Sequence, residues 1–170
     1  MSLVCLDTQI IQWGVMKRAS DSQSQQFISR ASDFIVWLDK QKVDIILPSL
    51  IVGELLVPIA PHDHAQVLAK LSTDWMIVDY DIRAARLFAE MRYDSAIKQI
   101  MDDIRNRNPF ATRKQLIADV LIIATAIVNG AEKIYSHNHD FLALAKRYVS
   151  AENFLDVQIQ TSFLGKDQTE

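Results

Sequence analysis

Short apolar runs alternate along the chain with longer stretches in which apolar residues recur at every third or fourth position. The short runs are typical of buried strands, and the longer stretches are typical of helices that pack one face on a sheet. We therefore predict an α/β fold whose sheet has four to five mainly parallel strands. The strands are expected at residues 3–6, 44–47, 76–80 and 133–136, with a weaker edge strand at 154–159.

The helical stretches lie between these strands, at residues 8–17, 27–38, 64–71, 82–105 and 140–147. Two further helices are indicated by their ends. Ser49 is a natural N-cap for a helix that Pro58 stops, and Thr112 caps a helix that ends near Gly130. We expect all these elements to form a single domain over residues 1–164, with a frayed tail at 165–170.

The chain has 170 residues, of which 49% are hydrophobic and 23% charged, and these values fit one globular domain. Its net charge of −3 gives no overall attraction for nucleic acid, so a polyanion would have to be bound locally, by a metal or a basic patch. The single cysteine, Cys5, excludes an internal disulfide and fits a reducing compartment. Because no signal peptide is visible and no apolar run is long enough to span a membrane, we expect a cytoplasmic protein.

Four acidic residues stand where the predicted elements meet one edge of the sheet. Asp7 follows the first strand, Asp140 follows the fourth, and Glu54 lies one turn into the helix after the second. Ligands of parallel sheets bind at the carboxyl ends of the strands, so these three side chains are expected close together. Asp119 lies in an apolar helix, where an idle carboxylate is costly. The alternative is that these acids are surface caps and salt-bridge partners, above all Asp140.

Carboxylates gathered in one place repel one another unless a cation or a proton lies among them. Oxygen ligands without a nearby cysteine pattern suit Mg²⁺ or Mn²⁺ rather than zinc. We therefore interpret the four acids as a candidate divalent-metal site with phosphate-ester chemistry. The His62/His64 pair invites a zinc site, but it has no third ligand nearby, and surface histidines are the simpler interpretation.

The segments that carry these acids resemble those of the PIN-domain proteins, and most of all those of the VapC-type toxins of bacterial toxin–antitoxin pairs. In chain order the segments are LDTQ, PSLIVGELL, ADVLIIATAIVNGAEKIYS and SHNHDF. The resemblance extends over nearly the whole chain. It implies a doubly wound sheet and a metal-dependent endoribonuclease with a water nucleophile. It also implies an RNA substrate and an antitoxin partner, and the apolar helices favour a homodimer.

The resemblance also assigns roles to individual residues. Asp7, Glu54 and Asp119 correspond to the first three acids of the site that holds Mg²⁺ or Mn²⁺. Thr8 and Ser49 match hydroxyl positions that support this site. These roles are implied by the resemblance, and the ends of the predicted strands independently favour the placement of the acids.

The fourth element of the resemblance departs from the usual pattern. Ser136 takes the place of a threonine as the supporting hydroxyl, and Asn138 stands where an aspartate often lies. Two interpretations stay open: Asp140 is the fourth acid, or Asn138 is a neutral metal ligand beside it.

Substrate binding is indicated less clearly. Four cations, Arg105, Arg107, Arg113 and Lys114, lie around an Asn-Pro break just before the Asp119 helix. They could contact an RNA backbone and offset the acidity of the chain, or they could be solvated charges of a loop.

Two other functions are weighed against the nuclease. The Ser136 and Asn138 departures motivate a catalytically weak PIN domain that serves as an RNA-binding or assembly module. A phosphatase of the haloacid-dehalogenase type also begins with an aspartate after its first strand. That class needs a second aspartate two residues later, where this chain has Gln9.

Overall fold

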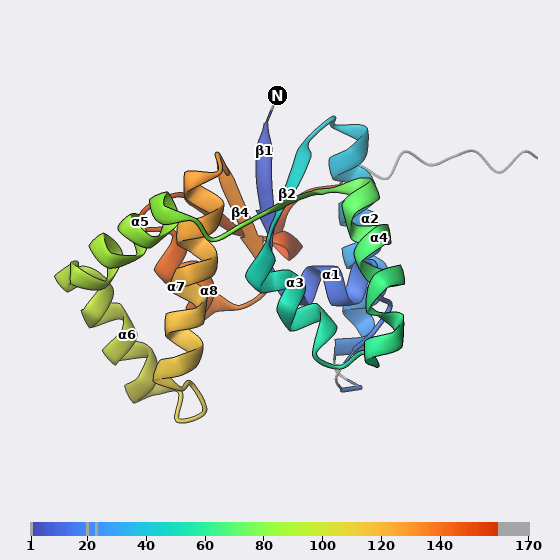
Figure 1. The fold of residues 1–170 in the computed structure, drawn as a ribbon. Coiled ribbons are helices and arrows are strands. Elements are labelled where there is room, and N and C mark those ends of the chain that lie inside the picture. Colours follow the sequence, from blue (N-terminus) through green and yellow to red (C-terminus); the bar gives the residue numbers. More distant parts are fainter. Residues whose placement is uncertain (1, 20, 23, 160–170) are drawn as a thin grey trace, which may run out of the picture.

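A five-stranded, all-parallel sheet forms the centre of the computed structural model, which describes residues 2–19, 21–22 and 24–159 (Figure 1). The order of the strands is β3-β2-β1-β4-β5. The chain builds first to one side of β1 and then to the other, so the sheet is doubly wound, with its switch point between β1 and β4. The predicted fold class is confirmed. The strands are β1 (Leu3–Leu6), β2 (Asp44–Pro48), β3 (Met76–Val78), β4 (Lys133–Ser136) and β5 (Ser150–Asn153).

Helices cover the sheet on both sides (Figure 1). On one side lie α1 (Thr8–Gly14), α2 (Phe27–Lys40), α3 (Ser49–Leu56) and α4 (His64–Asp74). On the other side lie α5 (Ile82–Tyr93), α6 (Ser95–Arg107), α7 (Arg113–Val128) and α8 (His139–Ala145). Short 3-10 turns occur at Ser24–Gln26, Pro61–Asp63 and Phe154–Asp156. Within the described ranges, no helix is long and apolar enough to cross a membrane.

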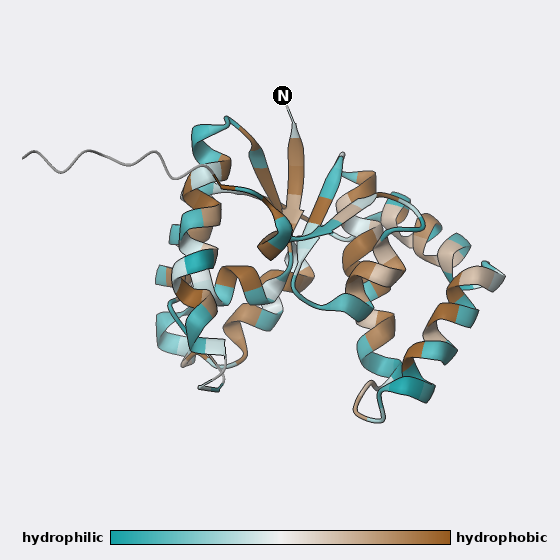
Figure 2. Cartoon of the chain, turned by 180° about the vertical axis from the view of Figure 1, so that it is seen from behind, coloured by the Kyte–Doolittle hydropathy of each residue, from teal (hydrophilic) through white to brown (hydrophobic). Residues whose placement is uncertain are grey.

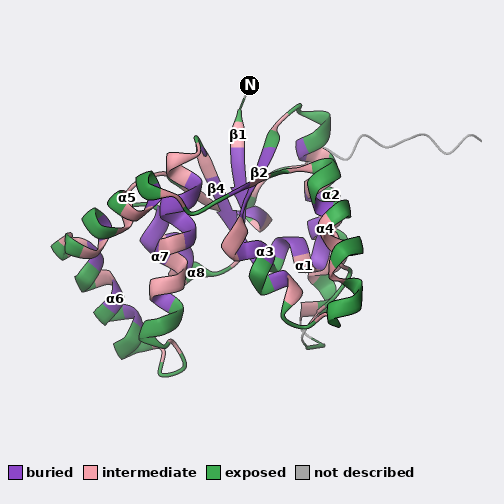
Figure 3. Ribbon diagram, viewed as in Figure 1, coloured by how far each residue is buried: buried purple, intermediate pink, exposed green. Residues whose placement is uncertain are grey.

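The strands are apolar because both faces of the sheet are covered. The central strand β1 carries the buried run Val4, Cys5 and Leu6, and the neighbouring β2 carries Ile45 to Leu47. Figure 2 shows the hydrophobic residues concentrated on the strands and on one face of most helices, and Figure 3 shows that these are the buried positions. The core is therefore continuous across the sheet, which leaves its carboxyl edge free to carry polar side chains.

Helices α1 and α2 pack closely because a glycine stands at their contact. A Cβ atom on Gly14 would lie 2.5 Å from the Cδ1 atom of Ile35 and 3.0 Å from the carbonyl oxygen of Ala31. This close approach brings α1, which begins directly after β1, firmly against the sheet. The start of α1 is one wall of the site described below.

Helix α7 has the ends that the sequence predicted. Thr112 caps it by accepting a hydrogen bond from the N–H of Gln115 at 3.2 Å, and the side chain of Gln115 accepts one from the N–H of Thr112 at 3.0 Å. This reciprocal capping box satisfies N–H groups that have no partner within the helix. Gly130 follows the helix with φ of 92°, a left-handed conformation that favours glycine.

Several predicted element boundaries were wrong, among them the end of the helix expected at 8–17, which stops at Gly14, and the end of the strand expected at 76–80, which stops at Val78. The helix expected over 82–105 is two helices, α5 and α6, with Asp94 in an extended conformation between them. The edge strand lies at Ser150–Asn153, and the apolar residues after it form a 3-10 turn whose Phe154 is buried. Ser49 is the first residue of α3 rather than its cap, which is Pro48. The predicted tail at 165–170, and the end of the predicted domain, lie outside the described residues.

Candidate active site

The four acidic side chains predicted from the sequence line one cleft at the switch point of the sheet. The cleft has a volume of about 530 Å³ and lies between α1, α3, α7, α8 and the turn that joins α6 to α7. Among its described lining residues are four carboxylates and no lysine, arginine or histidine. The lining residues are Asp7, Thr8, Gln9, Gln12, Glu54, Asn108, Phe110, Ala111, Gln115, Leu116, Asp119, Asn138 and Asp140.

Asp7 is held at the end of β1 by hydrogen bonds to its backbone and its side chain. Its N–H donates to the carbonyl oxygen of Tyr135 on β4 at 2.9 Å. Its carboxylate caps α1 by accepting from the N–H of Thr8 at 2.7 Å, and it accepts from the hydroxyl of Ser136 at 2.5 Å. Burial of the side chain raises the pKa of Asp7 from 3.8 to about 6, the nearby charge of Glu54 adds to this, and the two hydrogen bonds oppose it.

Asp119 lies in the second turn of α7, where the helix is half-buried on the cleft side. Burial raises the pKa of Asp119 from 3.8 to about 8, and the negative charges of Asp7, Glu54 and Asp140 raise it further. Within the described part of the chain, no hydrogen bond or ion pair reaches the Asp119 carboxylate. The carboxylate is therefore destabilised when ionised, and a cation or a proton in the cleft would relieve it.

Glu54 reaches the cleft from α3, on the side opposite α7. Its carboxylate accepts a hydrogen bond from the hydroxyl of Thr8. Thr8 follows Asp7 directly and is itself buried. One dipeptide, Asp7-Thr8, therefore provides one acid of the cleft and fixes a second. Thr8 and Ser136, both predicted as supporting hydroxyls, each contact a carboxylate of the cleft.

The fourth corner of the cleft contains both candidate residues, and each has a different partner. The side-chain oxygen of Asn138 caps α8 by accepting from the N–H groups of Asp140 at 2.9 Å and Phe141 at 3.4 Å. The carboxylate of Asp140 forms an ion pair with Arg107 at 2.9 Å and accepts from the side-chain amide of Asn108 at 3.4 Å. Asp140 therefore connects α8 to the end of α6, and Asn138 fixes the start of α8.

The remaining predicted site residues lie outside the cleft. Ser49 is the first residue of α3, five positions before Glu54, and is not among the lining residues. Arg105 and Arg113 line a separate groove of about 220 Å³ with Arg92, Lys98, Met101 and Asp102. Lys114 is exposed in the first turn of α7. Only Arg107 touches a cleft residue, through its ion pair with Asp140.

Several cleft residues were not expected from the sequence. Gln12 and Gln115 bring side-chain amides into the lining, and Asn108 and Phe110 bring the α6–α7 turn to its rim. Gln12 could have been found, because it lies one helical turn after Thr8 on the same face of α1. Nothing local marks Phe110, whose place depends on how α6 folds back on α8.

The donors in the cleft fit a hard divalent cation in their chemistry. All the charged groups are carboxylates, burial and neighbouring negative charges raise the pKa of Asp7 and Asp119, and Asn138 adds a neutral oxygen. In the present conformation, no three His, Cys, Asp or Glu side chains of the described residues are arranged to hold one ion. Binding of one ion by three of these carboxylates would therefore require their side chains to rearrange.

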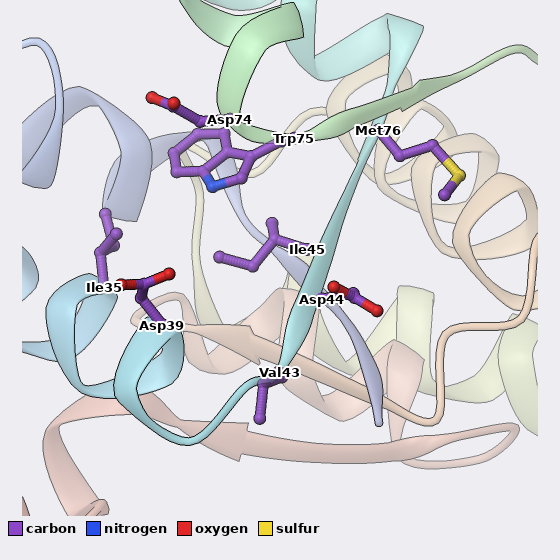
Figure 4. Close-up of a pocket in the computed structure, with 8 residues that line it drawn as sticks. All are labelled: Ile35, Asp39, Val43, Asp44, Ile45, Asp74, Trp75 and Met76. Atoms are coloured by element: carbon purple, nitrogen blue, oxygen red, sulfur yellow. The ribbon is translucent and has the colours of Figure 1, made fainter. Parts of the chain in front are cut away.

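A second hollow, of about 310 Å³, lies at the opposite, amino edge of β2 and β3 (Figure 4). Trp75 and Ile45 form its apolar part, and the carboxylates of Asp39, Asp44 and Asp74 surround it. These three acids are exposed to water, which solvates their charges without a counter-ion. The two aspartates whose pKa values burial raises, Asp7 and Asp119, both line the first cleft.

The histidines do not form a metal site within the described residues. His62 is exposed, and its Nε2 atom lies 3.4 Å from the Oδ2 atom of Asp63. His137 packs against the rings of Trp13 and Phe27, with centroids 5.6 Å and 4.6 Å away.

Comparison with known proteins gives a likeness of fold. No protein-family model matches the sequence, and no curated protein matches it significantly. Solved structures match over most of the chain. One of them is a chain of VapBC2 from Rickettsia felis, in a structure with a DNA fragment from the VapBC2 promoter. It is 17% identical to this chain, the match covers 89% of this chain and 98% of that chain, and the TM-score is 0.56.

Two further structures give similar values. A chain of FitAB bound to the IR36 DNA fragment is 18% identical over 92% of this chain and 99% of its own, with a TM-score of 0.52. A chain of DNA-bound VapBC from Salmonella typhimurium is 16% identical over 91% of this chain and 99% of its own, with a TM-score of 0.50. The chain therefore has the fold of the PIN-domain VapC proteins, as the resemblance of its sequence predicted.

Proposed function

We propose that the chain is a metal-dependent endoribonuclease that hydrolyses RNA phosphodiester bonds, and that it acts as the toxin of a toxin–antitoxin pair. One observation carries the proposal: four carboxylates line a cleft at the switch point of the sheet, and no lysine, arginine or histidine is among its described lining residues. Acids of this kind are expected to bind a divalent metal. The VapBC and FitAB structures that share the fold support an antitoxin partner for this chain.

Asp7, Glu54 and Asp119 would hold Mg²⁺ or Mn²⁺, directly or through water. Bound there, the ion would supply an activated water and neutralise charge that develops on the phosphate. The hydroxyls of Ser136 and Thr8 fix the carboxylates of Asp7 and Glu54, so these two groups are oriented before any ligand arrives.

Neutral donors complete the cleft. The amide groups of Gln12 and Gln115 lie in the lining and can donate hydrogen bonds to phosphate oxygens. They add no positive charge, so the attraction for a phosphate within the cleft depends on the metal. This predicts that nucleic acid enters the cleft in productive form only when the metal is bound.

The fourth corner favours a second candidate function, an RNA-binding or assembly module with little catalytic power. Asn138 carries no charge and its oxygen caps α8, while the charge of Asp140 is neutralised by Arg107. A site with three free acids would bind the metal more weakly than one with four. The two functions differ in whether bound RNA is cleaved.

The experiment is cleavage of a mixed-sequence single-stranded RNA with Mg²⁺, Mn²⁺ or EDTA. We expect metal-dependent cleavage by the wild type and a loss of at least about 100-fold in Asp7→Asn, with unchanged circular dichroism. Asp33→Asn, a change at an exposed acid of α2, is the matched control and should cleave normally. Full activity of Asp7→Asn would refute the assignment, and binding without cleavage by the wild type would favour the second function.

A further inference from the structure

The most exposed large apolar side chain of the described residues lies on the rim of the acidic cleft. Phe110 is 86% exposed, and it is also one of the residues that line the cleft. A ring that is so exposed contributes little to the stability of the core. Its face is available to a flat group that enters the cleft.

The turn that carries Phe110 is anchored. The N–H of Phe110 donates to the side-chain oxygen of Asn108 at 3.1 Å, and the N–H of Ala111 donates to the Asn108 carbonyl oxygen at 3.0 Å. Asn108 and its neighbour Arg107 both bind the carboxylate of Asp140. Asp140 therefore holds the turn against the cleft, and the backbone of Phe110 is positioned before a ligand binds.

The other side of the same turn is basic. Arg105, from the end of α6, and Arg113, from the start of α7, line a groove with Arg92 and Lys98. Among the described residues, Arg92, Lys98 and Arg113 form no ion pair, and Arg105 meets Asp102 only at 4.0 Å.

The two cations at the start of α7 are not explained by the stability of the fold. At the start of α7, Arg113 and Lys114 face the positive end of the helix dipole, which acids would complement better. The net charge of the chain is −3, so a groove lined by four cations and one acid, Asp102, is a local departure from its overall acidity. A polyanion that crosses the turn would compensate for both.

We propose that Phe110 and the groove of Arg92, Lys98, Arg105 and Arg113 form a path for single-stranded RNA into the acidic cleft. An unpaired base stacks on the ring of Phe110, and the phosphates on the far side of the turn lie along the four cations. Stacking on an aromatic ring together with a cationic groove is how proteins bind single strands with little sequence preference. The inference rests on the proposed function for the identity of the ligand as RNA.

The test measures binding apart from cleavage. The fluorescence anisotropy of a labelled 12-nucleotide single-stranded RNA is followed in EDTA, where metal-dependent cleavage is blocked. Phe110→Ala and Phe110→Leu should each weaken binding about 5- to 150-fold, because stacking on an aromatic ring is lost in both. Phe110→Trp should keep the affinity. Met76→Ala, at an exposed apolar residue on the amino edge of the sheet, should leave it unchanged.

The cationic part of the path has its own readout. The double variant Arg105→Ala/Arg113→Ala should lower the slope of log K against log salt concentration by about 1.4, since each phosphate contact on a single strand contributes about 0.7. Arg86→Ala, which removes an exposed arginine paired with Glu90 on α5, is the control and should keep the slope.

Several results would overturn the inference. One is wild-type affinity for single-stranded RNA in Phe110→Leu, whether or not Phe110→Ala also keeps it. The others are that the wild type binds duplex RNA as tightly as single-stranded RNA, or that it does not bind single-stranded RNA. A change of oligomeric state in Phe110→Ala without loss of RNA affinity would also overturn it, by making the ring a contact between copies. Binding that follows the predictions without any cleavage would keep the path and refute only the nuclease.

Discussion

Replacing Asp119 by asparagine should stabilise the metal-free protein at pH 8 and change its stability little at pH 4. In the folded chain the pKa of Asp119 is about 8, whereas in the unfolded chain it stays near 3.8. Between these values the folded state binds more protons than the unfolded state, so the free energy of unfolding falls as the pH rises from about 4 to about 8. Asparagine never ionises and escapes this penalty.

The magnitude follows from the two pKa values. Each pH unit between the two pKa values corresponds to about 1.4 kcal/mol, so ionisation of Asp119 can lower the free energy of unfolding by at most about 6 kcal/mol. Asp119 is only half-buried and titrates together with Asp7 and Glu54, so solvent and proton sharing reduce the penalty. We expect Asp119→Asn to gain about 2–3 kcal/mol at pH 8, or about 4–12 °C in Tm for a chain of this size.

The assay is urea denaturation followed by circular dichroism at pH 4, 6 and 8, in EDTA. Asp33→Asn on α2 is the control and should show no gain that grows with pH. Adding Mg²⁺ at pH 8 should stabilise the wild type by relieving the repulsion in the cleft, and should stabilise Asp119→Asn less. An Asp119→Asn protein that is no more stable than the wild type at pH 8 would refute the reasoning.

Three further predictions concern the fold and the support of the site. Gly14→Ala should lower the free energy of unfolding by about 1–3 kcal/mol, because its Cβ would lie 2.5 Å from an α2 side chain. Gly53→Ala, whose Cβ meets no atom within 4 Å, should raise it by about 0.5–1 kcal/mol. Equal effects of the two changes in urea denaturation would contradict this. Ser136→Ala removes a hydrogen bond that lowers the pKa of Asp7, so Asp7 should be more protonated at pH 6 in this variant. Calorimetry should therefore show that the affinity for Mn²⁺ falls more at pH 6 than at pH 8. An equal fall at the two pH values would contradict this role of Ser136. Thr112→Ala should lose about 1 kcal/mol through the cap of α7, with Thr112→Ser as the tolerated control.

The strands could be predicted because the sheet is buried on both faces. Continuous apolar runs such as residues 3–6 occur where no face meets water, and their polar neighbours mark the strand ends. The edge strand β5 escaped prediction because its sequence, SAEN, is polar, and its pairing with β4 depends on a distant segment. The apolar residues after it belong to a turn that fills the core with Phe154.

The break between α5 and α6 could not be predicted from periodicity, because the apolar stripe continues through it. Asp94 ends one helix and caps the next by accepting from the N–H of Ala96 at 2.8 Å. Its carboxylate also accepts from the hydroxyl of Tyr148, beyond α8, at 2.6 Å, and this bond and others lower the pKa of Asp94. The contact joins residues 54 positions apart, so the local sequence cannot reveal it.

The acids of the site were predictable and their surroundings were not. Asp7 follows the end of β1 directly and Glu54 lies in the helix that follows β2, so the topology alone brings them to one edge. Arg107 and Phe110 reach that edge because α6 folds back toward α8, and the sequence indicates no such course. Sequence analysis could leave Asp140 and Asn138 as alternatives, but only the structure shows that one pairs with Arg107 and the other caps α8.

Binding of Mn²⁺ tests the central claim most directly, since every proposed role of the cleft depends on a divalent ion there. Isothermal titration calorimetry at pH 7.5 compares the wild type with the Asp7→Asn/Asp119→Asn double variant. We predict one or two ions per wild-type chain, protons released on binding chiefly from Asp119, whose pKa of about 8 leaves it largely protonated at pH 7.5, and loss of binding in the double variant. Equal binding by the two proteins, or no binding by the wild type, would contradict the account.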